Sequence, residues 1–155
     1  MAAPDQPIFG ALAESLGFLL RLAQLQAFDE YFSAEGSPEH GPGEMSILLM
    51  IDANPMIRQG VLARALRIKR AHMTKIIQSF DRAGLVQTSV PADDRRSLEL
   101  TLTPAGKDRL ARVWDRVSLN ELGRPGNLTQ RETDTLKRLL RKYLSIAAPA
   151  EGADA

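Results

Sequence analysis

The stretch that decides the fold runs from residue 58 to residue 103 and reads RQGVLARALRIKRAHMTKIIQSFDRAGLVQTSVPADDRRSLELTLT. Its first part predicts two helices, over 58–66 and over 69–82, because apolar residues recur there at helical spacing. Residues 67–68 make the turn between them. The second helix ends before Gly84, since glycine readily takes the left-handed backbone conformation that ends many helices. The stretch therefore opens as a helix-turn-helix.

Two strand-like runs that contain Val and Thr follow, over 85–90 and over 97–102. The polar segment 91–96 separates them, which is typical of a hairpin with an extended charged tip. Helix, turn, helix and hairpin within fewer than 50 residues is the order of a winged helix-turn-helix, a helix-turn-helix with an appended β-ribbon. We therefore predict a mainly α-helical fold with a small β-hairpin wing.

Amphipathic helices flank this lobe on both sides. Apolar residues recur at helical spacing from Ile8 onward. After the hairpin, Thr103 is a hydroxyl N-cap for one helix, and Thr129 with Glu132 forms a capping box for the last. The expected parts of a single protomer over 1–155 are a helix at 8–34, a loop at 36–43, a helix at 44–53, the winged helix-turn-helix lobe at 44–103, helices within 104–147 and a frayed tail at 148–155.

The bulk composition fits a globular protein. The 155 residues are 44% hydrophobic and 25% charged, close to the average of folded domains. The longest apolar run, 45–51, is too short to cross a bilayer, and the first residues lack the basic and apolar regions of a secretory signal. We therefore expect a cytoplasmic protein without a membrane partner.

Several kinds of chemistry lack the residues they need. The chain has no cysteine, which removes disulfides, thiolate nucleophiles and thiolate metal ligands. Two histidines, His40 and His72, are too few for a histidine metal site. No nucleophile elbow, phosphate-binding glycine loop or cluster of histidines with carboxylates is present. We expect no enzyme activity, no metal and no cofactor.

Positive charge is concentrated in one part of the chain. The net charge is only +1, but residues 67–96 hold seven Lys or Arg against three Asp or Glu. Within that part, the helix over 69–82 has an apolar stripe made of Met73, Ile76, Ile77 and Phe80. The opposite face and the helix start carry donors for bases and phosphates, unless they are ordinary solvated charges. The candidate DNA-binding residues of this helix are Lys69, Arg70, His72, Thr74, Lys75 and Gln78.

The hairpin tip carries Asp94, Arg95 and Arg96, and core packing does not explain two adjacent arginines there. An arginine on a rigid ribbon can enter a narrow minor groove, where the negative potential is enhanced. DNA phosphates repel Asp94, so we expect its carboxylate to orient a neighbouring guanidinium through a bidentate pair. The alternative is a turn with solvent-exposed charges. Arg95 and Arg96 complete the candidate DNA-binding residues.

The wing sequence resembles the MarR family of bacterial transcriptional regulators. Residues 94–103 match that family's pattern Asp-x-Arg-x5-Leu-Thr, and residues 104–106 continue in its usual way. Residues 62–66 and 84–86 also look like the family's helix-turn-helix and the entry to its wing. The order of elements is similar over nearly the whole chain.

Two residues depart from the family pattern. Arg67 stands where a glycine or an asparagine often makes the turn. Lys69 stands where a serine or a threonine often caps the second helix of the helix-turn-helix, over 69–82, which is called the recognition helix. Both changes add positive charge and remove a local preference. They bear on the geometry of the turn and not on the fold.

The resemblance implies a homodimer that pairs through dimerisation helices at 8–34 and 104–147. A two-fold dimer places two recognition helices about 34 Å apart, one turn of DNA, which predicts a pseudo-palindromic operator. The usual role in the family is repression that a small molecule relieves. The implied partners are therefore double-stranded DNA, a second copy of the chain and a small-molecule effector.

Effectors of this family often bind between the dimerisation helices and the DNA-binding lobe. Similar regulators respond to aromatic acids or their CoA thioesters, and Arg21 is a possible partner for a carboxylate or a CoA phosphate. The alternative is that these side chains are only core packing or surface ion pairs. The candidate ligand-binding residues are Phe18, Arg21, Leu22, Phe28, Tyr31, Phe32, Met45 and Trp114.

A winged helix that contacts another protein and has no DNA target is the alternative function. The outward face of the second helix should then be apolar or acidic. Here that face carries Lys75, Gln78 and Arg82. A DNA-binding transcriptional regulator, a repressor released by a ligand, is therefore the favoured interpretation.

Overall fold

The chain forms two compact units in the computed structural model, which describes residues 8–33, 42–119 and 127–148. Residues 31–117 form the first unit, which we call the central lobe, and residues 1–30 and 118–155 form the second, the terminal unit. The side chains at 30–33, 42 and 113–119 are not among those described. The predicted loop at 36–43 and the frayed tail fall almost entirely outside the described residues.

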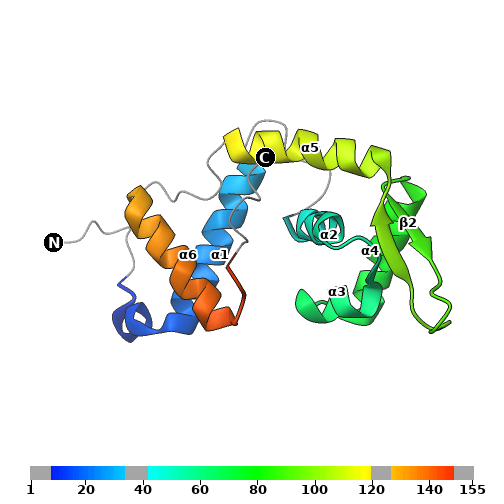
Figure 1. Ribbon diagram of the computed structural model, residues 1–155. Helices are drawn as coiled ribbons and strands as arrows, with labels where there is room; N and C mark the ends of the chain where they lie inside the picture. Colours follow the sequence, from blue (N-terminus) through cyan, green and yellow to red (C-terminus); the bar gives the residue numbers. More distant parts are fainter. Residues whose placement is uncertain (1–7, 34–41, 120–126, 149–155) are drawn as a thin grey trace. The chain divides into compact units, whose positions relative to one another are not determined.

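The central lobe is a winged helix-turn-helix, as predicted (Figure 1). The helix-turn-helix and the hairpin follow one another in the expected order. The elements are α2 (Pro42–Ala53), β1 (Ile57–Arg58), α3 (Gln59–Ala65), α4 (Arg70–Arg82), β2 (Val86–Ser89), β3 (Glu99–Leu102) and α5 (Pro104–Leu119).

The wing is part of a three-stranded antiparallel sheet with the order β1-β3-β2. Val86 lies opposite Leu102, and Ser89 lies opposite Glu99. The sequence did not predict β1, which pairs Ile57 with Leu100 on the other side of β3. A strand of two residues is too short to show the alternation by which a strand is recognised. Because β1 leads directly into α3, it fastens the helix-turn-helix to the wing.

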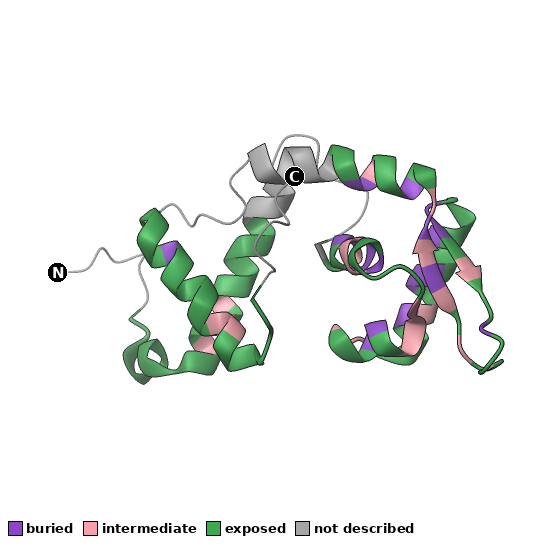
Figure 2. Cartoon of the chain, viewed as in Figure 1, coloured by how far each residue is buried: buried purple, intermediate pink, exposed green. Residues whose placement is uncertain are grey.

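A continuous hydrophobic core lies inside the central lobe (Figure 2). The helices and the sheet contribute apolar side chains that are nearly or fully buried. The largest of them are Phe80, Ile47, Leu48, Ile51, Leu62, Met73, Leu100 and Val86. This packing holds α3, α4 and the hairpin in fixed positions relative to one another.

Two residues with left-handed backbone end the helices of the helix-turn-helix. Arg67 has a φ of 54° and makes the turn after α3, where the N–H of Ile68 donates to the carbonyl oxygen of Ala63 at 2.9 Å. Gly84 has a φ of 70° and follows the end of α4, as predicted from the presence of a glycine at this position. The departure at Arg67 therefore keeps the turn, but with a residue for which this conformation is costly.

The start of α5 rests closely on the segment that joins α4 to β2. Thr103 caps α5 by accepting a hydrogen bond from the N–H of Gly106 at 3.0 Å, and its hydroxyl donates to the carbonyl oxygen of Gly84 at 2.6 Å. Gly106 is buried, and a Cβ atom added to it would lie 2.1 Å from the carbonyl oxygen of Leu85. Only a glycine fits at this contact.

The terminal unit corrects the predicted first helix. In place of one helix over 8–34, the chain has the 3₁₀ helix η1 (Gly10–Glu14) and the α-helix α1 (Leu16–Ser33). Ser15 separates them with an extended backbone, and its Oγ accepts a hydrogen bond from the N–H of Phe18 at 3.4 Å. The apolar spacing continues through this serine, so periodicity alone did not reveal the break.

The last helix, α6 (Gln130–Leu144), begins with the predicted capping box. The carboxylate of Glu132 accepts a hydrogen bond from the N–H of Thr129 at 2.8 Å. The helix ends before the predicted Ala147, because Ser145 has a left-handed backbone with a φ of 56°. The capping box thus predicted the start of this helix correctly, whereas the predicted end lies beyond the observed one.

Most described residues of the terminal unit are exposed (Figure 2), and apolar residues are numerous among them. They lie on η1, on α1, on α6 and just beyond its end. The set includes Leu12, Leu16, Leu19, Leu25, Phe28, Leu136, Leu139, Tyr143, Leu144 and Ile146. None of the described helices has the length and apolar character to cross a membrane.

Candidate nucleic-acid interface

The helix α4 divides into a buried face and an exposed face. Its apolar stripe is in the core as predicted, with Met73 and Phe80 fully buried and Ile76 and Ile77 nearly so. The opposite face turns Lys75, Gln78 and other polar side chains to the surface. This face carries hydrogen-bond donors and acceptors of the kinds that can pair with base edges.

The start of α4 is basic and open. Lys69 is the N-cap residue, with an extended backbone and no hydrogen bond from its side chain to the helix. Arg70 and His72 follow, both exposed, and the first turn holds no acidic residue. The free N–H groups of a helix start and its positive dipole end favour an anion. Lys69 therefore contributes charge where another residue type would contribute a cap.

Thr74 differs from the other candidates on α4 because it is half-buried. Its hydroxyl donates to the backbone oxygen of Arg70 at 3.0 Å. It also accepts a hydrogen bond from Nε2 of Gln59, the first residue of α3, at 2.9 Å. Thr74 therefore connects the two helices of the helix-turn-helix as well as lying beside the exposed face.

The wing tip is organised around Asp94. Its Oδ1 accepts a hydrogen bond from the backbone N–H of Arg96 at 3.0 Å, and its Oδ2 accepts one from the hydroxyl of Ser97 at 2.5 Å. These two bonds, with that from Ser97 the larger cause, lower the pKa of Asp94. The predicted bidentate pair with a guanidinium is not formed among the described residues, where a backbone N–H and a hydroxyl donate to the carboxylate instead. Asp94 shapes the turn and leaves Arg95 and Arg96 exposed.

An ion pair connects the wing tip to β1. Nη2 of Arg58 lies 2.6 Å from Oδ2 of Asp93; the Arg58 side chain is partly exposed and that of Asp93 is exposed. The hydrogen bond and the charge of Asp93 raise the pKa of Arg58. The wing is therefore fastened at its tip by this pair and along its length by the pairing of β1 with β3.

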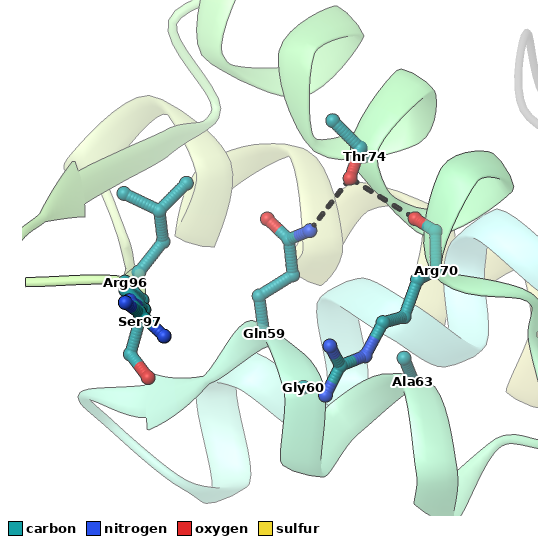
Figure 3. A pocket seen from close by; sticks show the side chains of 8 residues that line it. Gln59, Gly60, Ala63, Arg70, Thr74, Arg96 and Ser97 are labelled. Atoms are coloured by element: carbon teal, nitrogen blue, oxygen red, sulfur yellow. Dashed lines mark hydrogen bonds between the residues drawn. The ribbon is translucent and has the colours of Figure 1, made fainter. Parts of the chain in front are cut away.

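A cavity of about 290 Å³ lies where α3, α4 and the loop end of the wing meet (Figure 3). Arg70 comes from α4 and Arg96 from the wing, so the cavity has a guanidinium-bearing residue on two sides. The lining residues are Gln59, Gly60, Ala63, Arg70, Thr74, Arg96, Ser97 and Leu98. Three of the candidate DNA-binding residues thus share one cavity.

The central lobe therefore holds every candidate DNA-binding residue. Seven of them are exposed and Thr74 is half-buried. The candidate ligand-binding residues are divided between the two units. Phe18, Arg21, Leu22 and Phe28 belong to α1 in the terminal unit, whereas Met45 belongs to the core of the central lobe and is 5% exposed. The side chains of Tyr31, Phe32 and Trp114 lie outside the described residues, and the effector pocket stays a prediction.

Sequence comparison places the chain among known regulators. The model of the MarR family matches residues 42–98. A putative transcriptional regulatory protein for the hcr operon of Thauera aromatica is 31% identical over 136 residues, which are 87% of this chain and 82% of that protein. The chain belongs to the MarR family. It is thus a MarR-family transcriptional regulator, and this family is one of regulators rather than enzymes.

Solved structures of MarR-family proteins agree with the fold. The transcriptional repressor CouR bound to a 23-mer DNA duplex is 31% identical with a TM-score of 0.79, over 90% of this chain and 99% of that one. CouR bound to p-coumaroyl-CoA is 29% identical with a TM-score of 0.73, over 89% and 97%. A probable transcriptional regulator from Pseudomonas aeruginosa is 25% identical with a TM-score of 0.74, over 85% and 98%.

Sequence reasoning missed three residues of this MarR-family lobe that fasten the wing and the recognition helix. They are Arg58, Gln59 and Asp93, which contact partners on other elements. Arg58 and Asp93 are 35 positions apart, so no local pattern connects them. The one available signal was the presence of two aspartates, Asp93 and Asp94, at a tip that should contact DNA.

Proposed function

We propose that this regulator binds duplex DNA with α4 in the major groove and the wing at the neighbouring minor groove. The observation that carries the proposal is the exposed face of α4, where Lys75 and Gln78 lie opposite a fully packed core. A helix that presents an amide and a cation in this way can pair with adenine, guanine or phosphate. The DNA-bound structure of CouR, at 31% identity, supports the same use of the lobe.

Different residues take different tasks in this proposal. Lys75 and Gln78 contact base edges, whereas Lys69 and Arg70 at the helix start contact phosphates. Arg96 enters the minor groove from the wing, since the hydrogen bond from its N–H to Asp94 holds its backbone in place. Binding should therefore combine a charge-dependent part with a sequence-dependent part.

The salt dependence of DNA binding tests the proposal. Several neutralised phosphates make the affinity fall steeply with added salt, as fluorescence anisotropy of a labelled duplex would show. Arg96→Ala should weaken binding by roughly 1–3 kcal/mol, the scale of one side-chain contact to a base edge, without a change in circular dichroism. Arg138→Ala, an exposed arginine on α6, is the matched control and should bind as the wild type does. Salt-independent binding, or an Arg96→Ala variant of normal affinity, contradicts the proposal.

We also propose that the chain acts as a homodimer on a pseudo-palindromic operator. The exposed apolar side chains of η1, α1 and α6 support this, because large exposed apolar patches mark surfaces that meet a partner. Selection of bound duplexes from a random pool should recover an inverted repeat, with half-sites one DNA turn apart. Light scattering should give twice the mass of one chain. A monomer that selects a single half-site is the contradicting result.

The proposed effector is an aromatic acid or its CoA thioester, which releases a repressor from DNA. The structure of CouR with p-coumaroyl-CoA supports this class, and Arg21 on α1 is an exposed cation for its carboxylate or phosphate. Adding p-coumaroyl-CoA, CoA or benzoate to the protein–duplex complex should identify whether the aromatic acid or the CoA group of the effector is recognised. We expect release by at least one aromatic compound and weaker release from Arg21→Ala. Complexes that withstand all three contradict this effector class.

A further inference from the structure

Gln59 contacts both parts of the lobe to which DNA binding is assigned. Its backbone N–H donates to the carbonyl oxygen of Leu98, the last residue of the wing loop before β3, at 2.8 Å. Its side-chain Nε2 donates to Oγ1 of Thr74 on α4 at 2.9 Å. No base-reading role was assigned to this residue. Gln59 is nevertheless hydrogen-bonded both to the wing and to the recognition helix α4.

The other half of the Gln59 side chain is unpaired. Oε1 is buried and has no hydrogen-bond partner among the described residues. Figure 3 shows this oxygen on the side of the cavity where Arg96 and Ser97 lie, while the nitrogen points to Thr74. A buried acceptor without a donor lowers stability. Among the described residues, the side chain of Gln59 therefore has one hydrogen-bond partner, Thr74.

We propose that Gln59 is a positioning residue that couples the orientation of α4 to the position of the wing. This inference rests on the proposed function and deepens it. The bond to Thr74 adds to the core packing in setting the fine rotation of α4 about its own axis, because Thr74 lies at the edge of the exposed face and is also bonded to Arg70. The backbone bond to Leu98 keeps Gln59 itself at a fixed distance from the wing.

Coupling of this kind affects sequence discrimination more than general affinity for DNA. Base-edge contacts need Lys75 and Gln78 in the correct register while Arg96 occupies the neighbouring groove, whereas phosphate contacts tolerate small rotations. Loss of the side-chain bond should therefore reduce binding to the preferred sequence and leave non-specific binding unchanged. A residue with a merely structural role would lower both together, through loss of folded protein.

The test compares Gln59→Met with the wild type on two probes. One is the duplex that the wild type selects from a random pool, and the other is a scrambled duplex of the same length and composition. We expect Gln59→Met to bind the selected duplex about five- to tenfold more weakly, the scale of coupled residues in one network. Its affinity for the scrambled duplex and its urea midpoint should not fall. A preserved ratio between the two duplexes overturns the inference.

A double-mutant cycle identifies the hydrogen bond as the cause. Gln59→Met combined with Thr74→Val should be no weaker on the selected duplex than either change alone, because both remove the same bond. Gln59→Met combined with Lys69→Ala should show additive losses, because Lys69 is exposed without a side-chain bond to the helix and its proposed phosphate contact tolerates small rotations. Additive losses in the first pair contradict the proposal.

The outcomes separate this inference from the function on which it rests. A wild type that shows no salt-dependent DNA binding refutes the proposed function itself. A wild type that binds and discriminates, with a Gln59→Met variant that discriminates equally well, refutes only the coupling by Gln59. If Gln59→Met does not fold, Thr74→Val removes the same bond from the other side, and its ratio between the two duplexes decides in the same way.

Discussion

Replacing Gly106 with alanine should destabilise the central lobe, although alanine is the better helix former. Gly106 lies in the first turn of α5, where its N–H completes the cap made by Thr103. An added Cβ would lie 2.1 Å from the carbonyl oxygen of Leu85 and 3.0 Å from its carbonyl carbon. Both atoms are backbone, so neither can swing away as the end of a side chain can.

The expected size of the effect is a balance of three contributions. Alanine gains up to about 1 kcal/mol of helix propensity over glycine. Separating α5 from the backbone of Leu85 costs roughly 1–3 kcal/mol, as overpacking does elsewhere. That separation also strains the bond from the N–H of Thr103 to the oxygen of Leu85, which is 3.1 Å long and is worth about 1 kcal/mol. The steric cost outweighs the propensity gain, and we expect a net loss of about 2 kcal/mol.

Urea unfolding followed by circular dichroism measures this loss, with all variants at one protein concentration because association shifts apparent stability. Gly60→Ala is the matched control in the same lobe, since its added Cβ would meet only the tip of Arg70, at 3.8 Å. That variant should gain up to about 1 kcal/mol, because Gly60 lies within α3. A Gly106→Ala variant as stable as the wild type would refute the reasoning from this contact.

Three further predictions concern other parts of the chain. Arg67→Asn should raise the free energy of unfolding by about 0.5–1 kcal/mol, because asparagine tolerates the left-handed turn better than arginine; a lower thermal midpoint contradicts this. Thr133→Val should stabilise the terminal unit by about 1 kcal/mol, because the Thr133 hydroxyl is buried without a partner among the described residues. A lower urea midpoint of unfolding would contradict this. The pKa of Asp94 is lowered in the folded protein. The stabilisation that Asp94 gives to the folded state is therefore complete above its pKa in the unfolded chain, about 3.9, and is lost as the pH falls through its lower pKa in the folded state. Carboxyl NMR should therefore find Asp94 titrating below about 3.9, and an ordinary midpoint would show that the wing-tip bonds do not form in solution.

The sequence predicted the parts of the fold that depend on local signals. The apolar stripe of α4, the glycine after it and the capping box before α6 each occupy a few neighbouring residues. The hairpin was also found, because two strand-like runs flank a polar tip. In each of these cases the residues that form the pattern are the residues that make the structure.

The sequence could not show features that depend on distant partners. β1 exists because Ile57 and Arg58 meet β3, about forty positions later in the chain. The partners of Asp94 depend on the exact conformation of the turn, which brings the hydroxyl of Ser97 and the backbone N–H of Arg96 within hydrogen-bond distance of its carboxylate. The role of Gln59 has the same origin, since its bond to Thr74 needs both helices in place.

The central lobe is one unbroken segment of chain, whereas the terminal unit is made from the two ends. A single exchange of genetic material could therefore replace the whole lobe while the rest of the chain stays the same. Both junctions fall inside helices, within α1 at residues 30–31 and within α5 at residues 117–118. Each residue gained or lost at such a junction turns the following helix by about 100°, so chimeras should work only when they preserve the helical phase.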